Sequence, residues 1–149
     1  MRRLEVPLWV AIILKSQDKC NIVAPDWLSL SFLRKKYEEE VKTPHKFSDL
    51  PGSWLEVSKI LLAKASDDLP EPAHQFKSIL QDLREIRLAK SRKGLMELNE
   101  SNIQLDGLSM MEINEIRPFV LTVMNQLRQL HETVSSEMQD DMQADDEEM

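Results

Sequence analysis

The stretch "AHQFKSILQDLREIRLAKSRK", residues 73–93, decides the fold class of this chain. Its apolar side chains recur every three or four residues, which places them on one face of an α-helix. We therefore predict a helix from about Pro72 to Lys93, broken or ended by Gly94. The apolar face is formed by Phe76, Ile79, Leu80, Leu83 and Ile86.

Two cations fall inside this apolar face. At about 100° per residue, Arg87 and Lys90 project onto the same arc as the apolar side chains. A cation there is costly unless its charged end reaches a carboxylate or water while its stem packs. We interpret both as structural or interface cations, and their candidate partners are Asp67, Asp68 and Glu112.

The same stretch allows a second interpretation, because five basic residues within ten positions are typical of a helix that contacts nucleic acid. Arg84, Arg92 and Lys93 lie outside the apolar arc and would be the DNA-contacting residues. Such a role predicts binding that weakens steeply with salt. The charge distribution argues against it, because residues 1–136 hold 19 basic and 19 acidic side chains.

The net charge of −7 comes from the C-terminal residues 137–149, which hold seven acidic residues and no basic ones. Such a segment is typical of a solvated, disordered tail. We therefore expect a disordered acidic tail over residues 135–149. A docking site for a basic partner is the alternative.

The rest of the chain also favours helices over sheet. Its 149 residues allow one domain with a core of ordinary size, and only three are glycine. No stretch shows sustained alternation of apolar and polar residues, so we predict almost no sheet. The expected fold is a mainly α-helical bundle.

Two helices are predicted between residues 27 and 65. Asp26 is expected to cap a helix over residues 27–40, which a loop over residues 41–53 follows. Ser53 and Glu56 have the spacing of a capping box, and they predict a helix over residues 54–65.

A last helix is predicted after the stretch. Ser109 and Glu112 have the spacing of a second capping box. Pro118 predicts a break near Arg117 and a restart of the helix. The restarted helix is expected to turn inward Phe119, Val120, Val123, Met124, Leu127 and Leu130.

The start of the chain, "MRRLEVPLWVAIILK", resembles a secretory signal only superficially. Glu5 and Pro7 interrupt it and no cleavage site follows, while its seven-residue apolar run is far short of the about 20 that cross a membrane. We predict a buried helix starting near Pro7 and covered on both faces. A single cysteine, Cys20, forms no internal disulfide, which favours an intracellular protein with Cys20 in its core rather than as a nucleophile.

No motif indicates catalysis or a cofactor. His45, His74 and His131 are scattered, and none belongs to a metal-binding pair. A phosphate-binding loop is also missing from the sequence. We therefore expect no enzyme, no metal and no cofactor.

Seven short motifs, in this order and with these gaps, resemble the eukaryotic family of GINS subunits called partner of Sld five number two. The resemblance runs from about Glu5 to Leu130. Its motifs are "EVPLW" at 5–9, "LK" at 14–15, "KC" at 19–20, "PDW" at 25–27, "ASDD" at 65–68, "REIRLAK" at 84–90 and "MEIN" at 111–114.

The resemblance implies a non-catalytic scaffold in a nuclear heterotetramer of four related subunits. With the MCM ring motor and its other accessory factor, that tetramer makes the replicative helicase, so association with DNA would be indirect. Members of the family carry a small strand-rich domain before "EVPLW". We therefore expect residues 1–25 to be a remnant of that domain with a linking helix, and residues 26–134 to be the helical domain.

In that interpretation, sibling subunits cover apolar flanks such as those bearing Trp54, Leu62 and Leu88, and the isolated chain is poorly soluble or unstable. A freestanding, monomeric helical bundle is a further alternative. The candidate structural or interface residues are Trp9, Trp27, Trp54, Asp67, Asp68, Arg84, Arg87, Lys90 and Glu112.

Overall fold

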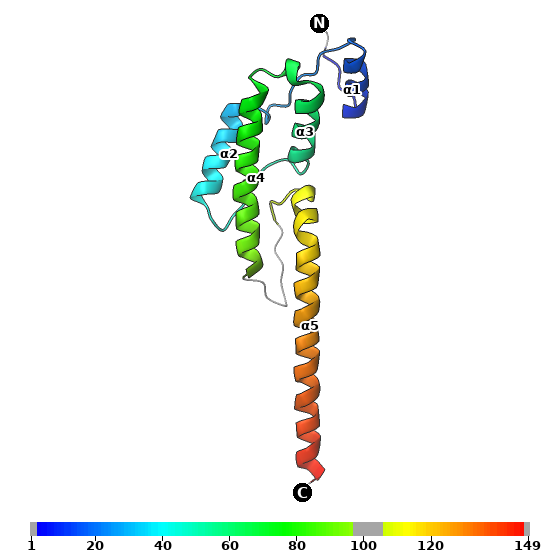
Figure 1. Ribbon diagram of the computed structural model, residues 1–149, viewed down its shortest axis with the longest axis vertical. Helices are drawn as coiled ribbons and strands as arrows, with labels where there is room; N and C mark the ends of the chain where they lie inside the picture. Colours follow the sequence, from blue (N-terminus) through cyan, green and yellow to red (C-terminus); the bar gives the residue numbers. More distant parts are fainter. Residues whose placement is uncertain (1–2, 97–105, 148–149) are drawn as a thin grey trace.

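The computed structural model describes residues 3–96 and 106–147, and within these ranges the chain is helical without a β-strand (Figure 1). This agrees with the predicted mainly α-helical bundle. The elements are α1 (Leu8–Ser16), α2 (Leu30–Lys42), α3 (Trp54–Lys64), the 3-10 helix η1 (Ser66–Asp68), α4 (Ala73–Met96) and α5 (Met110–Glu147).

The core lies where α2 and α3 pack against α4. The predicted helix over residues 72–93 is confirmed as α4, and its Phe76 and Leu83 are fully buried. Leu33 of α2 and Trp54 of α3 meet them in the same cluster. Gly94 lies inside α4 rather than at its end, so the predicted break is wrong.

The helix starts agree with the sequence only in part. The capping box of Ser109 and Glu112 is confirmed, because the Ser109 N–H donates to Glu112 Oε2 over 2.7 Å and the Glu112 N–H donates to Ser109 Oγ over 3.3 Å. Ser53 makes no such bond, since its backbone (φ −115°, ψ 25°) is not in the extended conformation of a capping residue. The cap of α2 is Ser29 rather than Asp26.

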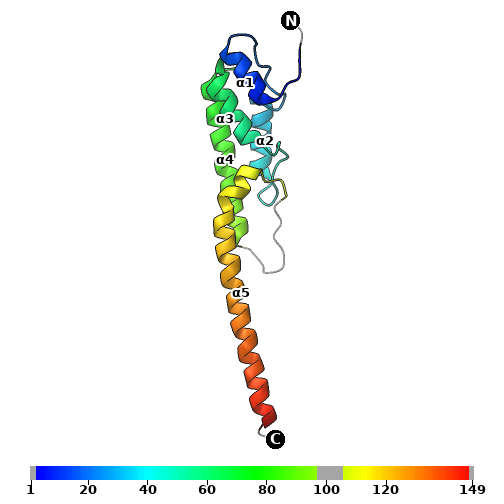
Figure 2. The ribbon, with the colours of Figure 1, turned by 90° about the vertical axis from the view of Figure 1, so that its right-hand side faces the viewer.

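Helix α5 continues through Pro118, so the predicted break near Arg117 is wrong. Pro118 lacks the N–H that would bond to Asn114, and both residues are exposed, which lets water hydrate the free carbonyl. Figures 1 and 2 show α5 extending far past the end of α4. Phe119 and Leu130, expected to point inward, are therefore 55% and 62% exposed.

The expected disordered tail is also helical, since α5 runs on to Glu147. Residues 135–147 contain no glycine or proline, the two residues that most strongly interrupt a helix. The expectation of disorder was based on charge alone and did not take this into account.

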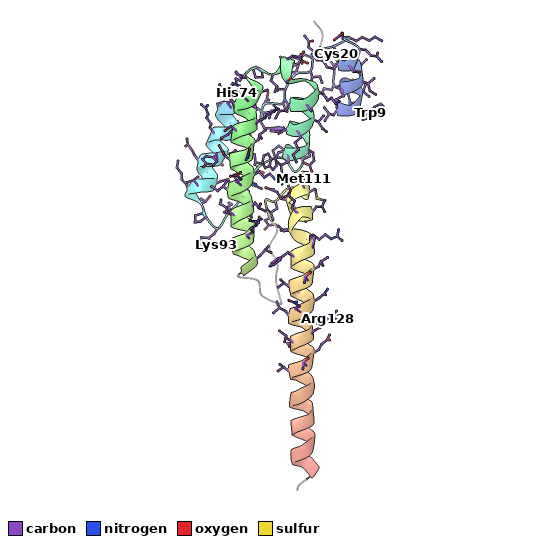
Figure 3. The ribbon with its side chains drawn as sticks, viewed as in Figure 1. Trp9, Cys20, His74, Lys93, Met111 and Arg128 are labelled. Atoms are coloured by element: carbon purple, nitrogen blue, oxygen red, sulfur yellow. The ribbon has the colours of Figure 1, made fainter. Side chains whose placement is uncertain are left out.

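Helix α1 lies at the outside of the bundle rather than buried on both faces. Trp9 is 67% exposed and Ile13 is 48% exposed, whereas Leu8 packs against the core. Trp9 points away from the neighbouring helices in Figure 3. Cys20 is half-buried, and its Sγ lies 3.7 Å from the Ala11 carbonyl oxygen.

Candidate functional site: a buried ionic cluster

Arg87 stands at the centre of a buried ionic cluster between α2, α4 and α5. Its side chain is fully buried, and all five of its N–H groups are used. Nε and Nη2 donate to the two carboxylate oxygens of Glu112 over 2.7 and 3.0 Å, while Nη1 donates to Glu40 Oε1 over 2.6 Å. The remaining two bonds reach the carbonyl oxygens of Ser48, over 3.2 Å, and Gly107, over 2.5 Å.

Glu40 is the second fully buried member of the cluster. Besides the bond from Arg87, its Oε1 accepts from the N–H and the Oγ of Ser48, each over 2.8 Å. Its Oε2 accepts from Lys90 Nζ. The predicted pairing of Arg87 with Glu112 is therefore confirmed, whereas Lys90 pairs with Glu40 and with none of the three carboxylates expected from the sequence.

Lys90 fixes the loop between α2 and α3. Its Nζ donates to the carbonyl oxygens of Thr43 and Lys46 over 2.8 and 3.0 Å, in addition to Glu40. The ring of Phe47 lies 4.9 Å from the Arg87 guanidinium and 5.8 Å from Lys90 Nζ. Cation–π interactions with the face of this ring therefore also stabilise the two cations.

Gly107 is required by this geometry at the start of α5. Its φ of +81° is one that side chains disfavour, and a Cβ there would lie 3.0 Å from Phe47 Cβ. The turn aims its carbonyl at Arg87 and leads directly into the Ser109–Glu112 capping box. The cluster consequently sets where α5 begins and against which helix it packs.

Asp67 and Asp68 belong to a different site from the one predicted. Both pair with Lys15 of α1, whose Nζ lies 2.7 Å from an oxygen of each. Asp68 Oδ2 also accepts the Ile22 N–H over 2.7 Å. The expectation that they pair with Arg87 or Lys90 is wrong, because they lie in η1, near the opposite end of α4. Their ion pairs with Lys15 connect α1 to the bundle instead.

The other candidates lie at different depths. Trp54 is fully buried, and Trp27 packs partly buried against the core. Arg84 is not simply solvated, because its Nη2 donates to Glu115 Oε1 over 2.5 Å across to α5. Because Trp54 is fully buried within this chain, its side chain does not form part of an accessible flank, which differs from the expectation that a sibling covers it.

Leu62 and Leu88 line a groove of about 480 Å³ between α3 and α4. Leu55 and Leu80 also line it, and the polar rim carries more cations than anions. The rim consists of Lys59, Lys77, Arg84, Glu85, Ser58 and Gln81. Two of the three flanks named from the sequence are therefore accessible apolar surface.

The charged state of the cluster is stabilised by its own pairing. Burial alone would raise the pKa of Glu40, but the hydrogen bonds from Lys90 and Ser48 and the charge of Arg87 lower it below its ordinary value. Burial also disfavours the charged Arg87, yet Glu112 and Glu40 raise its pKa. Such groups, each paired with the others, suit a structural role better than proton transfer.

We expect this lowered pKa to make the fold sensitive to acid. The ionised Glu40 carboxylate is more stable in the folded chain than in the unfolded one. Its contribution to the free energy of unfolding is therefore complete above the ordinary pKa of glutamate, and it is lost as the pH falls through the lowered pKa of the folded state. Between about pH 6 and about pH 3, wild type should lose more stability in urea unfolding than Glu40→Gln does. Glu38→Gln, exposed on the same helix, is the control and should follow wild type. Parallel curves for wild type and Glu40→Gln would contradict the assignment.

Among the described residues, no group of three or more His, Cys, Asp and Glu side chains is arranged to hold a metal ion. None of the described helices combines the length and the apolar character needed to span a bilayer.

The sequence matches two protein-family models. Residues 27–131 match the helical bundle domain of GINS complex proteins, and residues 1–23 match the PSF2 N-terminal domain. Together with the helical fold, this places the chain in the class of GINS helical-bundle proteins.

Three relatives illustrate the similarity, each named DNA replication complex GINS protein PSF2. The protein from Debaryomyces hansenii is 74% identical over 91% of this chain and 66% of its own length. Those from Candida albicans and Saccharomyces cerevisiae are 62% and 51% identical, over 100% and 88% of this chain and 72% and 62% of their own lengths. The chain belongs to the PSF2 family of GINS complex proteins, which confirms the resemblance, and it spans about two thirds of the length of these relatives.

Proposed function

We propose that this chain is a non-catalytic scaffold subunit of a nuclear GINS heterotetramer. Its partners would be the three sibling subunits and, through the complex, the MCM ring and its other accessory factor in the replicative helicase. The names of the relatives support a role in DNA replication. DNA would be contacted only through the complex, because Arg84 is engaged by Glu115 and the body of the chain is neutral.

The observation that carries this proposal is the accessible groove between α3 and α4. Leu62 and Leu88 line it at the edge of the core, and both side chains are half-buried, so part of each is accessible from the groove. An accessible apolar groove with a polar rim supports a protein-binding surface at this place. Because the buried cations and carboxylates neutralise one another, they support a rigid scaffold rather than chemistry on a substrate.

A scaffold of this kind would act through differential binding. A rigid tetramer that fits one conformation of the ring motor better than another raises the population of that conformation. The buried cluster contributes by fixing α2, α4 and the start of α5 in one arrangement. Catalysis in this account belongs to the ring.

We expect charge placed in the groove to remove the chain from the complex. The double variant Leu62→Glu, Leu88→Glu, co-expressed with the three siblings, should recover at least about tenfold less sibling protein, because each carboxylate would be desolvated at the contact. Lys64→Glu and Arg92→Glu, exposed on the same two helices, form the matched control. Circular dichroism should show all variants folded. Equal recovery from the groove variant and its control would contradict the proposal.

A further inference from the structure

The loop that follows α2 begins with the sequence Thr-Pro-His-Lys, residues 43–46. Of the seven prolines in the chain, only Pro44 follows a serine or a threonine. Proline-directed Ser/Thr kinases modify a hydroxyl at this position, because proline brings no backbone N–H that would be left unpaired in the kinase cleft. Kinases of this class also favour a basic residue three positions after the acceptor, where this chain has Lys46. The loop thus carries a sequence of the kind that these kinases recognise.

This sequence is accessible in the folded chain. All four of its residues are exposed, and Figure 1 shows this end of α2 at the outer edge of the bundle. Thr43 is the C-terminal cap of α2, and its backbone (φ −118°, ψ 87°) has already left the helical conformation, as expected before a proline. Ser48, further along the same loop, is by contrast buried, and its Oγ donates to Glu40 Oε1 over 2.8 Å. A kinase can therefore reach Thr43, whereas Ser48 is enclosed.

The Thr43 hydroxyl makes a hydrogen bond that phosphorylation would remove. Its Oγ1 donates to the Glu39 carbonyl oxygen over 2.6 Å, and the Thr43 N–H donates to the same oxygen over 3.1 Å. Thr122 of α5 makes a similar exposed bond, from its Oγ1 to the Pro118 carbonyl oxygen over 2.9 Å, but it is followed by Val123. Thr122 is therefore an internal control, since it has a similar hydroxyl without the kinase sequence.

A phosphate on Thr43 conflicts with the charges at the end of α2. The last carbonyls of a helix carry partial negative charge, and Glu38 and Glu39 lie just before this end. Lysines line the hollow beside Thr43, but two of them are already paired: Lys36 Nζ lies 2.8 Å from Glu39 Oε2, and Lys42 Nζ lies 3.7 Å from Glu38 Oε2. They would neutralise the phosphate only by giving up these pairs. Repulsion and the lost hydroxyl bond therefore both favour opening of the last turn.

The opened turn would act on the bonds that Lys90 makes to the loop. Lys90 Nζ donates to the carbonyl oxygens of Thr43 and Lys46, the first and last residues of the kinase sequence. The Lys46 N–H also donates to the Thr43 carbonyl oxygen, over a long 3.4 Å, and this bond closes the turn between them. Because both bonds end on the Thr43 carbonyl, movement of Thr43 would break them together.

We propose that Thr43 is the acceptor of a proline-directed Ser/Thr kinase and that its phosphorylation releases the loop after α2 from Lys90. The kinase transfers the γ-phosphoryl group of ATP to the hydroxyl. A bond forms between Thr43 Oγ1 and the γ-phosphorus, the bond from that phosphorus to the oxygen shared with the β-phosphate breaks, and ADP leaves with the bonding electrons. The hydroxyl proton passes to a carboxylate of the kinase.

Incubation of the full chain with ATP and a purified cyclin-dependent kinase, followed by mass spectrometry of its peptides, tests the acceptor. We expect phosphate on Thr43, and at least about tenfold less in Pro44→Ala, which keeps the hydroxyl but brings an N–H into the kinase cleft. Thr122 in the same sample should stay unmodified. Equal phosphate on Thr43 in wild type and Pro44→Ala, phosphate on neither, or equal modification of Thr122 would each overturn the site.

Hydrogen exchange of the purified phosphorylated chain tests the release of the loop. Amides of residues 41–48 should exchange at least about fivefold faster than in the unmodified chain, whereas those around Leu83 in α4 should not change. Thr43→Val removes the hydroxyl bond without adding charge, so it should give a smaller increase. Unchanged or slower exchange over residues 41–48 would show that the lysines hold the phosphate in place, and it would overturn the release. Neither experiment requires a sibling subunit, so both are independent of the proposed function.

Discussion

Arg87→Ala should lower the free energy of unfolding far more than any other single substitution on α4 outside its apolar core. The variant leaves Glu40 and Glu112 buried without their shared cation, and it frees the carbonyl oxygens of Ser48 and Gly107. Breaking one side of a buried ion pair costs about 3–5 kcal/mol. For a chain of this size, we expect the midpoint of urea unfolding to fall by about 1–3 M.

Two companion variants separate charge from geometry in this experiment. Arg87→Lys keeps the charge but loses the planar fork that spans both oxygens of Glu112, so its midpoint should lie between those of wild type and Arg87→Ala. Arg92→Ala removes an exposed arginine from the same helix and should change stability by less than about 0.5 kcal/mol. A midpoint for Arg87→Ala that equals that of Arg92→Ala would show that the cluster does not hold the fold.

Truncating Trp54 should give the second large loss. Its side chain is fully buried among Leu33, Phe76 and Leu83. Trp54→Ala removes this packing and leaves a cavity, at a cost of about 3–5 kcal/mol in urea unfolding. Trp54→Phe should cost less than about 1.5 kcal/mol, because the Trp54 Nε1–H is buried without a hydrogen-bond partner and its removal leaves no acceptor unpaired.

The Trp54 variants also test its placement in the core against the sequence interpretation. There, Trp54 was expected on a flank that siblings cover. A Trp54→Ala chain that unfolds like wild type but no longer recovers siblings would restore that interpretation. Loss of stability in the chain by itself supports the core position.

Much of the fold was predictable because it follows from local periodicity. Phe76 and Leu83 recur at helical spacing, and the pairing of Ser109 with Glu112 depends on residues three apart. The burial of Arg87 could be inferred from its place within the apolar arc of α4. Each of these inferences requires only the geometry of a single helix.

The partners of the buried cations were less predictable, because they come from distant parts of the chain. Glu40 ends a run of three glutamates that looks solvated, although its spacing of seven residues from Leu33 puts it on the buried face of α2. That spacing was the available signal. Asp68 offered no such signal, because Lys15 lies 53 residues away and only the tertiary fold brings the two together.

The predicted break at Pro118 shows a different limit of sequence reasoning. Proline removes one hydrogen bond, but whether the helix ends depends on whether the freed carbonyl is exposed. That exposure depends on which face of α5 packs against α4, which the sequence of α5 alone does not determine. Leu130 lies outside the core because α5 extends past the end of α4.

We propose that this chain is one of four different subunits of a single scaffold. Light scattering during size-exclusion chromatography of the chain co-expressed with its three siblings tests this claim most directly. We expect one species with the mass of one copy of each subunit, and we expect the chain to be lost from it in the Leu62→Glu, Leu88→Glu variant. Elution of the wild-type chain as a stable monomer, separate from the other three, would contradict the account.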